Sequence, residues 1–473
     1  MAGKPGFRTL WLSRKQGYGA KIPRLRRLGL LYVDPSTGSK LPGIQGVRAL
    51  AAFSILTLHV WFDSAPDGIR ISLGHVGDAL FTHLALGVAL LFVLSGFLLY
   101  RPFAAAVMRA RRLPSLRRYL VNRALRIVPA YWFILLFASF VLSTTRVRSA
   151  DGFRLETGAL TDPLTLVLNL TFLHNLYPPT LFTGIGVAWA LTTVVTFYVL
   201  LPLLVLLAVV LALRASDRKG RRLAALAPVA LLFVVGISAK VLLVVLPRAE
   251  FSDGWAPDRA SVFERSFFGH ADFFALGLLV AVLRVDSEDG LLRLPPWWRK
   301  AVVATMVAIA IPTAVFTAGA TADGSGRAYV YDALMVAVCA LLLILIVLPA
   351  HGEQTRLVRI FESRPVFAVG LVSYSLFIWH LPIIFWLRAQ GLTLGGPPGF
   401  VLNLVVVATI SFVLATLTYR YLEFPALRHK SRGPRLAAAQ GPATDPGPPV
   451  PEPHHVDALE ARPAAGSSER QAW

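Results

Sequence analysis

Long apolar runs alternate with short polar segments along most of this chain, and the period of the pattern is set by the width of a membrane. Runs long enough to cross about 30 Å of hydrocarbon as helices lie at 44–62, 79–100, 127–143, 186–213, 225–247, 267–284, 299–319, 328–349, 366–388 and 399–422. The pattern therefore predicts an all-α fold, a polytopic membrane bundle of about ten transmembrane helices.

A shorter apolar stretch at 162–177 carries the polar residues Asn169 and His174. Basic residues concentrate at 101–126 and 214–222, and basic loops usually face the cytoplasm. Both loops reach that side only if 162–177 does not cross, so we expect this segment to dip in or to lie at the outer surface. The protein is then a multi-pass protein of the cell membrane with both termini cytoplasmic.

Composition divides the chain into three parts. We expect a basic cytoplasmic arm at 1–42, a membrane domain at 43–425, and a tail at 426–473 that is rich in Pro, Ala and Gly and therefore disordered. The chain has 55% hydrophobic residues and a formal net charge of +21, a combination typical of membrane proteins with basic loops. Because the basic runs lie between apolar spans, the expected partner is the lipid bilayer and not nucleic acid.

The single cysteine, Cys339, lies within an apolar run. One cysteine excludes an intrachain disulfide and a cysteine-rich metal site. We expect no metal site and no permanently bound cofactor.

Two ionisable residues, Arg48 and His59, lie eleven positions apart in the first apolar run. Eleven residues are nearly a whole number of helical turns, so both side chains lie on one face, about 16 Å apart along the axis. Charged groups in a membrane helix usually face the bundle interior or a water-filled cavity. Taken alone, His59 fits a structural histidine, hydrogen-bonded to a neighbouring helix, as well as it fits a catalyst.

The expected direction of each span places further polar residues at the depth of His59, in the outer half of the membrane. These residues are Trp189, His270, Asp272 and His380. A shared cavity would bring them together, and we take His59, Arg48, Asp272 and His380 as the candidate catalytic residues.

The inner boundary carries a different set. Arg123 and Arg126 are three residues apart, so they are neighbours on one helix face, and paired guanidinium groups can bind phosphate bidentately. Taken without the rest of the chain, such a pair more often anchors a span to lipid headgroups. Arg101 closes the second span at the same level, and Ser95-Gly96 permits a close approach of backbones there.

Taken together, the motifs of the chain resemble those of the acyltransferase-3 family of integral-membrane O-acyltransferases, over about 43–425. The matching pieces are Arg48-x10-His59, Leu91-Phe92-Val93-Leu94-Ser95-Gly96-Phe97-Leu98, Arg123-x-x-Arg126-Ile127-Val128-Pro129-x-Tyr131, Trp189-Ala190-Leu191 with Phe197-Tyr198, Ser373-Tyr374-Ser375-Leu376 with Trp379-His380-x-Pro382, and Tyr421-Leu422-Glu423-x-Pro425. Each piece is weak alone, whereas their number, order and spacing make the resemblance strong.

The resemblance implies transfer of an acyl group, expected to be acetyl, from acyl-CoA to a hydroxyl of a glycan, a lipid or a glycosylated small molecule. Acyl-CoA, with acetyl-CoA the expected form, is then a donor co-substrate. His59 is implied as the base, by direct attack of the hydroxyl or through an acyl-histidine. Arg123, Arg126 and Arg101 are implied to hold the donor, whose flexible arm passes Ser95 and Gly96.

The same resemblance assigns Trp189, Tyr198 and Tyr374 to substrate binding. The chain departs from the family pattern at Val194, where a glutamate is common, and at His270, where an arginine is common. Because Val194 replaces the common glutamate, a catalytically impaired member of the family is one alternative interpretation. A proton-coupled or solute transporter is the alternative from another class, because intramembrane His, Asp and Arg also form proton relays.

Overall fold

The computed structural model describes residues 41–150, 152, 154–245, 257–316, 326–348 and 355–429. The chain divides into two compact units, Met1–Ser431 and Arg432–Trp473, and every described residue belongs to the first. The expectations for the basic arm, apart from its last two residues, and for the tail beyond His429 lie outside the described residues.

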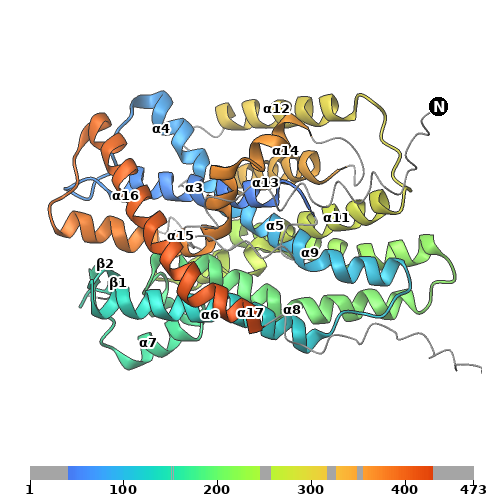
Figure 1. Ribbon diagram of the computed structural model, residues 1–473, viewed down its shortest axis with the longest axis horizontal. Helices are drawn as coiled ribbons and strands as arrows, with labels where there is room; N and C mark the ends of the chain where they lie inside the picture. The colour runs from blue at the N-terminus through green and yellow to red at the C-terminus, as the bar shows by residue number, and fades with distance from the viewer. Residues whose placement is uncertain are drawn as a thin grey trace, which may run out of the picture. The chain divides into compact units, whose positions relative to one another are not determined.

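Long helices make up most of the described chain (Figure 1). They are α3 (Ile44–Asp63), α5 (Leu86–Met108), α6 (Leu116–Phe140), α8 (Trp189–Ala212), α9 (Arg218–Val245), α11 (Ala271–Glu288), α12 (Trp298–Phe316), α13 (Gly326–Val347), α15 (Arg364–Ala389) and α16 (Gly396–Thr418). Shorter helices are α4 (Gly74–Thr82), α10 (Arg259–Glu264), α14 (Arg356–Phe361), the π-helical η6 (Tyr419–Glu423) and α17 (Phe424–His429).

Among the described residues, nine helices are long and apolar enough to span a membrane. The predicted all-helical membrane bundle is thereby confirmed. The difference from ten concerns α12, which reaches Phe316 at the border of the stretch 317–325 that the structure does not describe.

The segment 162–177 does not form a spanning helix. It contains α7 (Pro163–Leu170), whose eight residues extend only about 12 Å, followed by the single turn η2 (His174–Leu176). Asp162 caps α7 by accepting a 2.7 Å hydrogen bond from the backbone N–H of Thr165. The prediction of a short, non-spanning element is correct.

The sequence pattern did not predict a small antiparallel hairpin that precedes α7. Its strands are β1 (Thr145–Arg148) and β2 (Leu155–Gly158), paired from Thr145 opposite Gly158 to Arg148 opposite Leu155. Strand β1 also pairs with Gly184, whose φ of +74° and close approach to a buried asparagine both require glycine. The hairpin thus projects Arg146 from an irregular connection between two spans.

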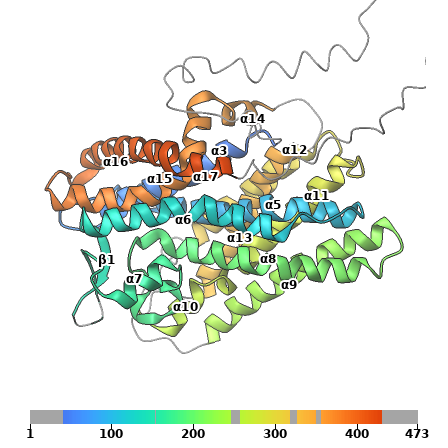
Figure 2. The same cartoon turned by 60° about the horizontal axis from the view of Figure 1, so that its bottom comes forward.

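Small residues bring four of the helices into close contact. The most extensive helix pairs are α5 with α11 and α3 with α15 (Figures 1 and 2). In the first pair, Gly96 and Gly277 face each other, and a Cβ on either would collide with the partner backbone. In the second pair, Gly370 lies against the backbone of Gln45. Glycine at such crossings allows backbones to approach in a membrane bundle, and the second crossing sets α15 beside α3.

Candidate active site

Two imidazoles from different helices face each other where α3 packs on α15. The ring centroids of His59 and His380 are 5.1 Å apart, and the rings are tilted by 58°. His380 is fully buried, whereas His59 is partly accessible. Two of the four candidate catalytic residues therefore form a pair, and its accessible member is His59.

Backbone carbonyls fix which nitrogen of each ring carries the proton. Nδ1 of His59 lies 2.9 Å from the carbonyl oxygen of Ile55, and Nδ1 of His380 lies 3.3 Å from that of Leu376. A carbonyl only accepts, so in each neutral ring Nδ1 donates and Nε2 keeps a lone pair. Within the described part of the chain, the buried Nε2 of His380 has no hydrogen-bond partner. The pair thus presents nitrogen acceptors that no other described residue uses.

Three arginines gather at the opposite end of α3. Arg48 lies within electrostatic range of Arg126 and Arg123 of α6, and also of Tyr198 and Glu423. None of the three guanidinium groups has an ion-pair partner within 4.0 Å among the residues that the structure describes. We call Arg48, Arg123 and Arg126 the arginine cluster. Like charges this close favour binding of a polyanion.

Glu423 borders this cluster. In the sequence it stands out only as part of the motif Tyr421-Leu422-Glu423-x-Pro425. Glu423 is buried in the π-helical turn η6 and accepts a 2.6 Å hydrogen bond from the Ser375 hydroxyl of α15. It also interacts electrostatically with Arg126 and Arg48. An acidic residue at the end of an apolar run was the available signal for its importance.

Both tyrosines assigned to substrate binding lie at the arginine cluster. Tyr374 donates a 2.8 Å hydrogen bond to the carbonyl oxygen of Ile127 on α6 and interacts electrostatically with Tyr198 and Arg126. Val194, which stands at the position of the common glutamate, is 8% exposed and belongs to the apolar core.

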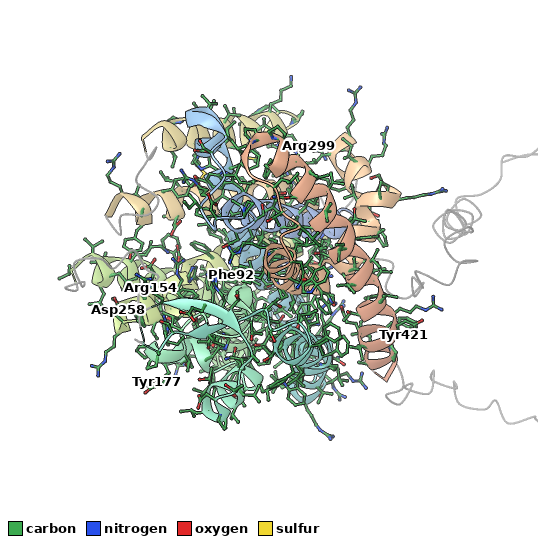
Figure 3. All side chains as sticks on the ribbon, turned by 90° about the vertical axis from the view of Figure 1, so that its left-hand side faces the viewer. Phe92, Arg154, Tyr177, Asp258, Arg299 and Tyr421 are labelled. Carbon is green, nitrogen blue, oxygen red and sulfur yellow. The ribbon has the colours of Figure 1, made fainter. Side chains whose placement is uncertain are left out.

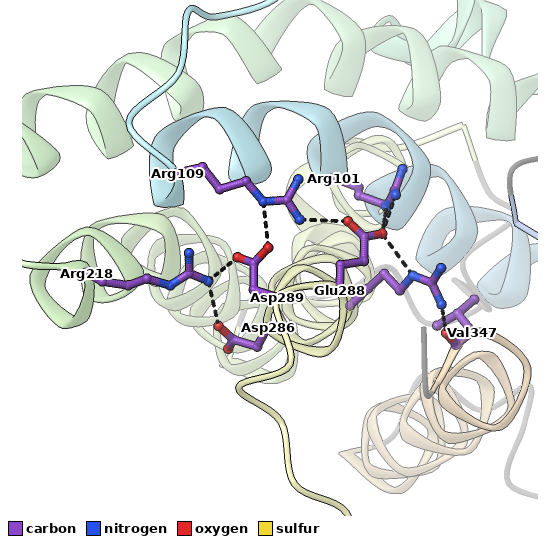
Figure 4. Close-up of polar contacts among 8 residues, drawn as sticks. Arg101, Arg109, Arg218, Asp286, Glu288, Asp289 and Val347 are labelled. Carbon is purple, nitrogen blue, oxygen red and sulfur yellow. Dashed lines mark hydrogen bonds and ion pairs between the residues drawn. The ribbon is translucent and has the colours of Figure 1, made fainter. Parts of the chain in front are cut away.

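Arg101 lies in a separate network of ion pairs (Figure 4). Its guanidinium is paired with Glu288, which also accepts hydrogen bonds from Arg109, at 2.9 Å, and from Arg284, at 3.0 Å. Next to it, Asp289 is paired with Arg109 and Arg218. Arg101 thus has a carboxylate at ion-pair distance, whereas the members of the arginine cluster have none within 4.0 Å among the described residues.

Ser95 and Gly96 serve the packing of α5. The Ser95 hydroxyl donates a 2.7 Å hydrogen bond to the carbonyl oxygen of Leu91, one turn earlier on the same helix. Gly96 faces the α5–α11 crossing. Neither contact involves the histidine pair or the arginine cluster.

The remaining polar residues expected at the depth of His59 form a second group. Trp189 and His270 have ring centroids 5.5 Å apart, and both rings contact Phe92, which lies in the interior (Figure 3). Asp272 accepts a 2.5 Å hydrogen bond from the buried Lys240 ammonium. In the described residues, no hydrogen bond or ring contact joins this group to the histidine pair.

The chain is similar to several known proteins. A family model described as "Acyltransferase domain" matches residues 41–420. Three curated proteins are each 25% identical to the chain over 81% of its length. They are a putative peptidoglycan O-acetyltransferase YrhL of Bacillus subtilis, the peptidoglycan O-acetyltransferase OatA of Listeria monocytogenes and nodulation protein 10 of Rhizobium leguminosarum.

The match covers 54% and 55% of the two peptidoglycan proteins and 92% of the nodulation protein, so the chain spans about half the length of the first two. No solved structure matches the chain significantly.

Proposed function

The chain belongs to the acyltransferase-3 family of multi-pass membrane acyltransferases, and from that premise we propose that it moves an acetyl group from acetyl-CoA to a hydroxyl of a glycan, a lipid or a glycosylated small molecule. The observation that carries the proposal is the division of α3 between two sites. The arginine cluster surrounds its first turns, and the histidine pair lies eleven residues further on, about 16 Å along the axis.

The arginine cluster fits the donor. The phosphates of coenzyme A are polyanionic, and Arg48, Arg123 and Arg126 supply guanidinium groups without paired carboxylates among the described residues. The basic loops at this end of the bundle favour a cytoplasmic position for it, and acyl-CoA is available there. The flexible arm of the donor is long enough to carry the thioester from the cluster to the histidine pair.

The histidine pair fits the transfer step. Nε2 of His59 takes the proton of the acceptor hydroxyl while the hydroxyl oxygen bonds to the thioester carbonyl carbon. The carbon–sulfur bond then breaks, and the proton passes from the imidazolium to the departing thiolate, giving an ester and free coenzyme A. A transient acyl-histidine uses the same nitrogen. Nε2 of His380 offers a second acceptor that orients the hydroxyl or the imidazole beside it.

The relatives support a glycan or glycosylated acceptor. Two of them are named for O-acetylation of peptidoglycan, and the histidine pair lies toward the end of the bundle remote from the arginine cluster. Placing that end on the outer face gives the site access to extracytoplasmic glycans.

The test uses the purified full chain in sealed proteoliposomes with acetyl-CoA labelled in the acetyl group. Peptidoglycan, a glycolipid extract and a glycosylated macrolide are offered separately as acceptors. We expect base-labile label on one of them together with stoichiometric release of free coenzyme A. Accumulation of labelled solute inside the vesicles without ester formation would favour a transporter, and donor binding without transfer would favour an impaired enzyme.

A further inference from the structure

A second pair of arginines lies at the other end of α3, where three segments of the chain meet. The guanidinium carbons of Arg146, on β1, and Arg388, on α15, lie 4.9 and 5.3 Å from the centroid of the Phe385 ring. Arg388 also donates a 3.2 Å hydrogen bond from Nη1 to the backbone oxygen of Asp63, the last residue of α3. The hairpin therefore meets α15 at this aromatic ring, and Arg388 connects the same place to the end of α3.

This meeting point lies next to the histidine pair. Asp63 follows His59 by four residues on α3, so it lies one turn, about 5.4 Å, closer to the helix end on the same face. Arg388 follows His380 by eight residues on α15 and is therefore two turns further along its helix.

Arg146 of the hairpin approaches α15 close to the position of His380, through Gly186. A Cβ added at Gly186 would lie 3.1 Å from Cδ2 of Leu381 and 3.7 Å from Cγ of Arg146. Leu381 is the residue directly after His380. Gly186 thus lies close both to Arg146 and to the residue that follows the buried histidine.

The charges at this point do not balance. Arg146 interacts electrostatically with Asp63 and Arg388, and burial lowers the pKa of its guanidinium below the ordinary value. In the described part of the chain, neither Arg146 nor Arg388 has an ion-pair partner within 4.0 Å. Two cations thus face one carboxylate. A half-buried guanidinium without a close partner costs free energy unless a ligand supplies the anion.

We propose that Arg146 and Arg388 bind an anionic group of the acceptor, a carboxylate or a phosphate, and thereby hold a neighbouring hydroxyl at His59. The inference rests on the proposed function, because it takes His59 as the base. A guanidinium donates two parallel hydrogen bonds to such a group. Asp63, whose backbone oxygen accepts the hydrogen bond from Arg388, lies one helical turn from His59, a span that a single charged sugar residue covers.

Binding measurements test the subsite without relying on turnover. The probes are three oligosaccharides that differ in one unit, which is glucuronate, glucose 6-phosphate or glucose. The full chain, purified in a neutral detergent at low salt, should bind a charged probe at least 10-fold more tightly than the neutral one, as expected for charge-assisted hydrogen bonds. The stronger of the two charged probes identifies the group.

Arg146→Met and Arg388→Met should each reduce this preference about 10-fold, and Arg388→Lys, which keeps a donor for the Asp63 carbonyl, should retain part of it. Arg154→Met is the matched control. Arg154 is exposed and directly precedes β2 of the same hairpin (Figure 3), so its substitution should leave the preference unchanged. Equal affinity for all three probes, no binding of any, or an unchanged preference in Arg146→Met would overturn the proposal.

Two further variants separate this outcome from failure of the proposed function. His59→Asn should lower the rate of acetyl transfer by about 10²-fold or more and keep the preference for the charged probe. Arg146→Met should keep the affinity for acetyl-CoA. If the unsubstituted chain shows the preference but transfers no acetyl group, only the donor and base assignments are rejected. If it transfers the acetyl group without any preference, only the acceptor subsite is rejected.

Discussion

The rings of His59 and His380 lie 5.1 Å apart, centroid to centroid, and each directs its Nδ1 to a carbonyl of its own helix. Both Nε2 atoms are therefore acceptors, and only His59 is partly accessible. One ring is open to a substrate, and the other is held behind it.

His59→Asn should lower the rate of acetyl transfer by about 10²–10⁴-fold, the range typical of a general base. The amide keeps polarity and approximate shape but cannot accept a proton near neutral pH. Single-turnover transfer and acetyl-CoA affinity are measured on the same preparation. An unchanged rate with intact donor binding would exclude His59 as the base.

His380→Asn should lower the transfer rate less, by about 10-fold, because this ring is buried and acts beside His59. The double variant should be no slower than His59→Asn alone, since residues that work as a unit are strongly non-additive. Independent, multiplicative losses measured in the four-member cycle would show that the two rings do not act together.

Arg123→Met and Arg126→Met should each weaken acetyl-CoA binding about 10-fold or more, because each removes a charged hydrogen-bond donor from the arginine cluster. Acetyl-CoA affinity is measured by calorimetry at low salt. Arg214→Met is the control, since this arginine is exposed at the end of α8. Equal affinities for all three variants would argue that the cluster contacts only lipid.

Glu423→Gln should reduce thermal stability and increase the stabilisation that acetyl-CoA confers. The substitution removes the carboxylate nearest the arginine cluster, and the phosphates of the donor then supply the missing anion. Ser375→Ala is the companion variant, because it removes a 2.6 Å hydrogen bond to Glu423 but keeps the charge. It should cost about 1 kcal/mol without enlarging the shift caused by acetyl-CoA. Identical shifts in both variants would contradict the electrostatic explanation.

His174 should make stability fall at acidic pH. Burial lowers its pKa from 6.5 to about 4, so the unfolded chain binds a proton between these values and the folded chain does not. The contribution is complete above pH 6.5 and is lost as pH falls toward 4, by up to roughly 3 kcal/mol. His174→Phe should flatten the pH dependence of the unfolding temperature between pH 7.5 and 5. A variant with the wild-type slope would assign that dependence to other groups.

The sequence predicted most of the spanning helices and the short segment at 162–177, because both follow from the length of apolar runs. It also predicted that Arg48 and His59 share one face of their helix, which follows from the helical period. It could not separate the histidine pair from the group around Trp189 and Asp272. The position of a residue along its helix predicts its depth in the membrane. Its neighbours on other helices depend instead on which helices pack together and on crossings such as Gly370 against Gln45.

The hairpin was missed for a different reason. Its strands have four residues each, too few for an alternating pattern to stand out, and their pairing with Gly184 involves a residue 38 positions after Arg146. The direction of the Glu423 side chain could not be predicted either, because no simple sequence pattern indicates a π-helical turn.

The π-helical turn that carries Glu423 makes the direction of its carboxylate depend on the length of the chain before it. A turn of this kind holds one residue more than an α-helical path between the same points, so the helix beyond it keeps its direction. Deleting a residue of α16 before this turn would instead rotate every residue after it by about 100° and swing the Glu423 carboxylate away from Ser375. Insertions and deletions in α16 should therefore be tolerated far less than substitutions on its lipid-facing side.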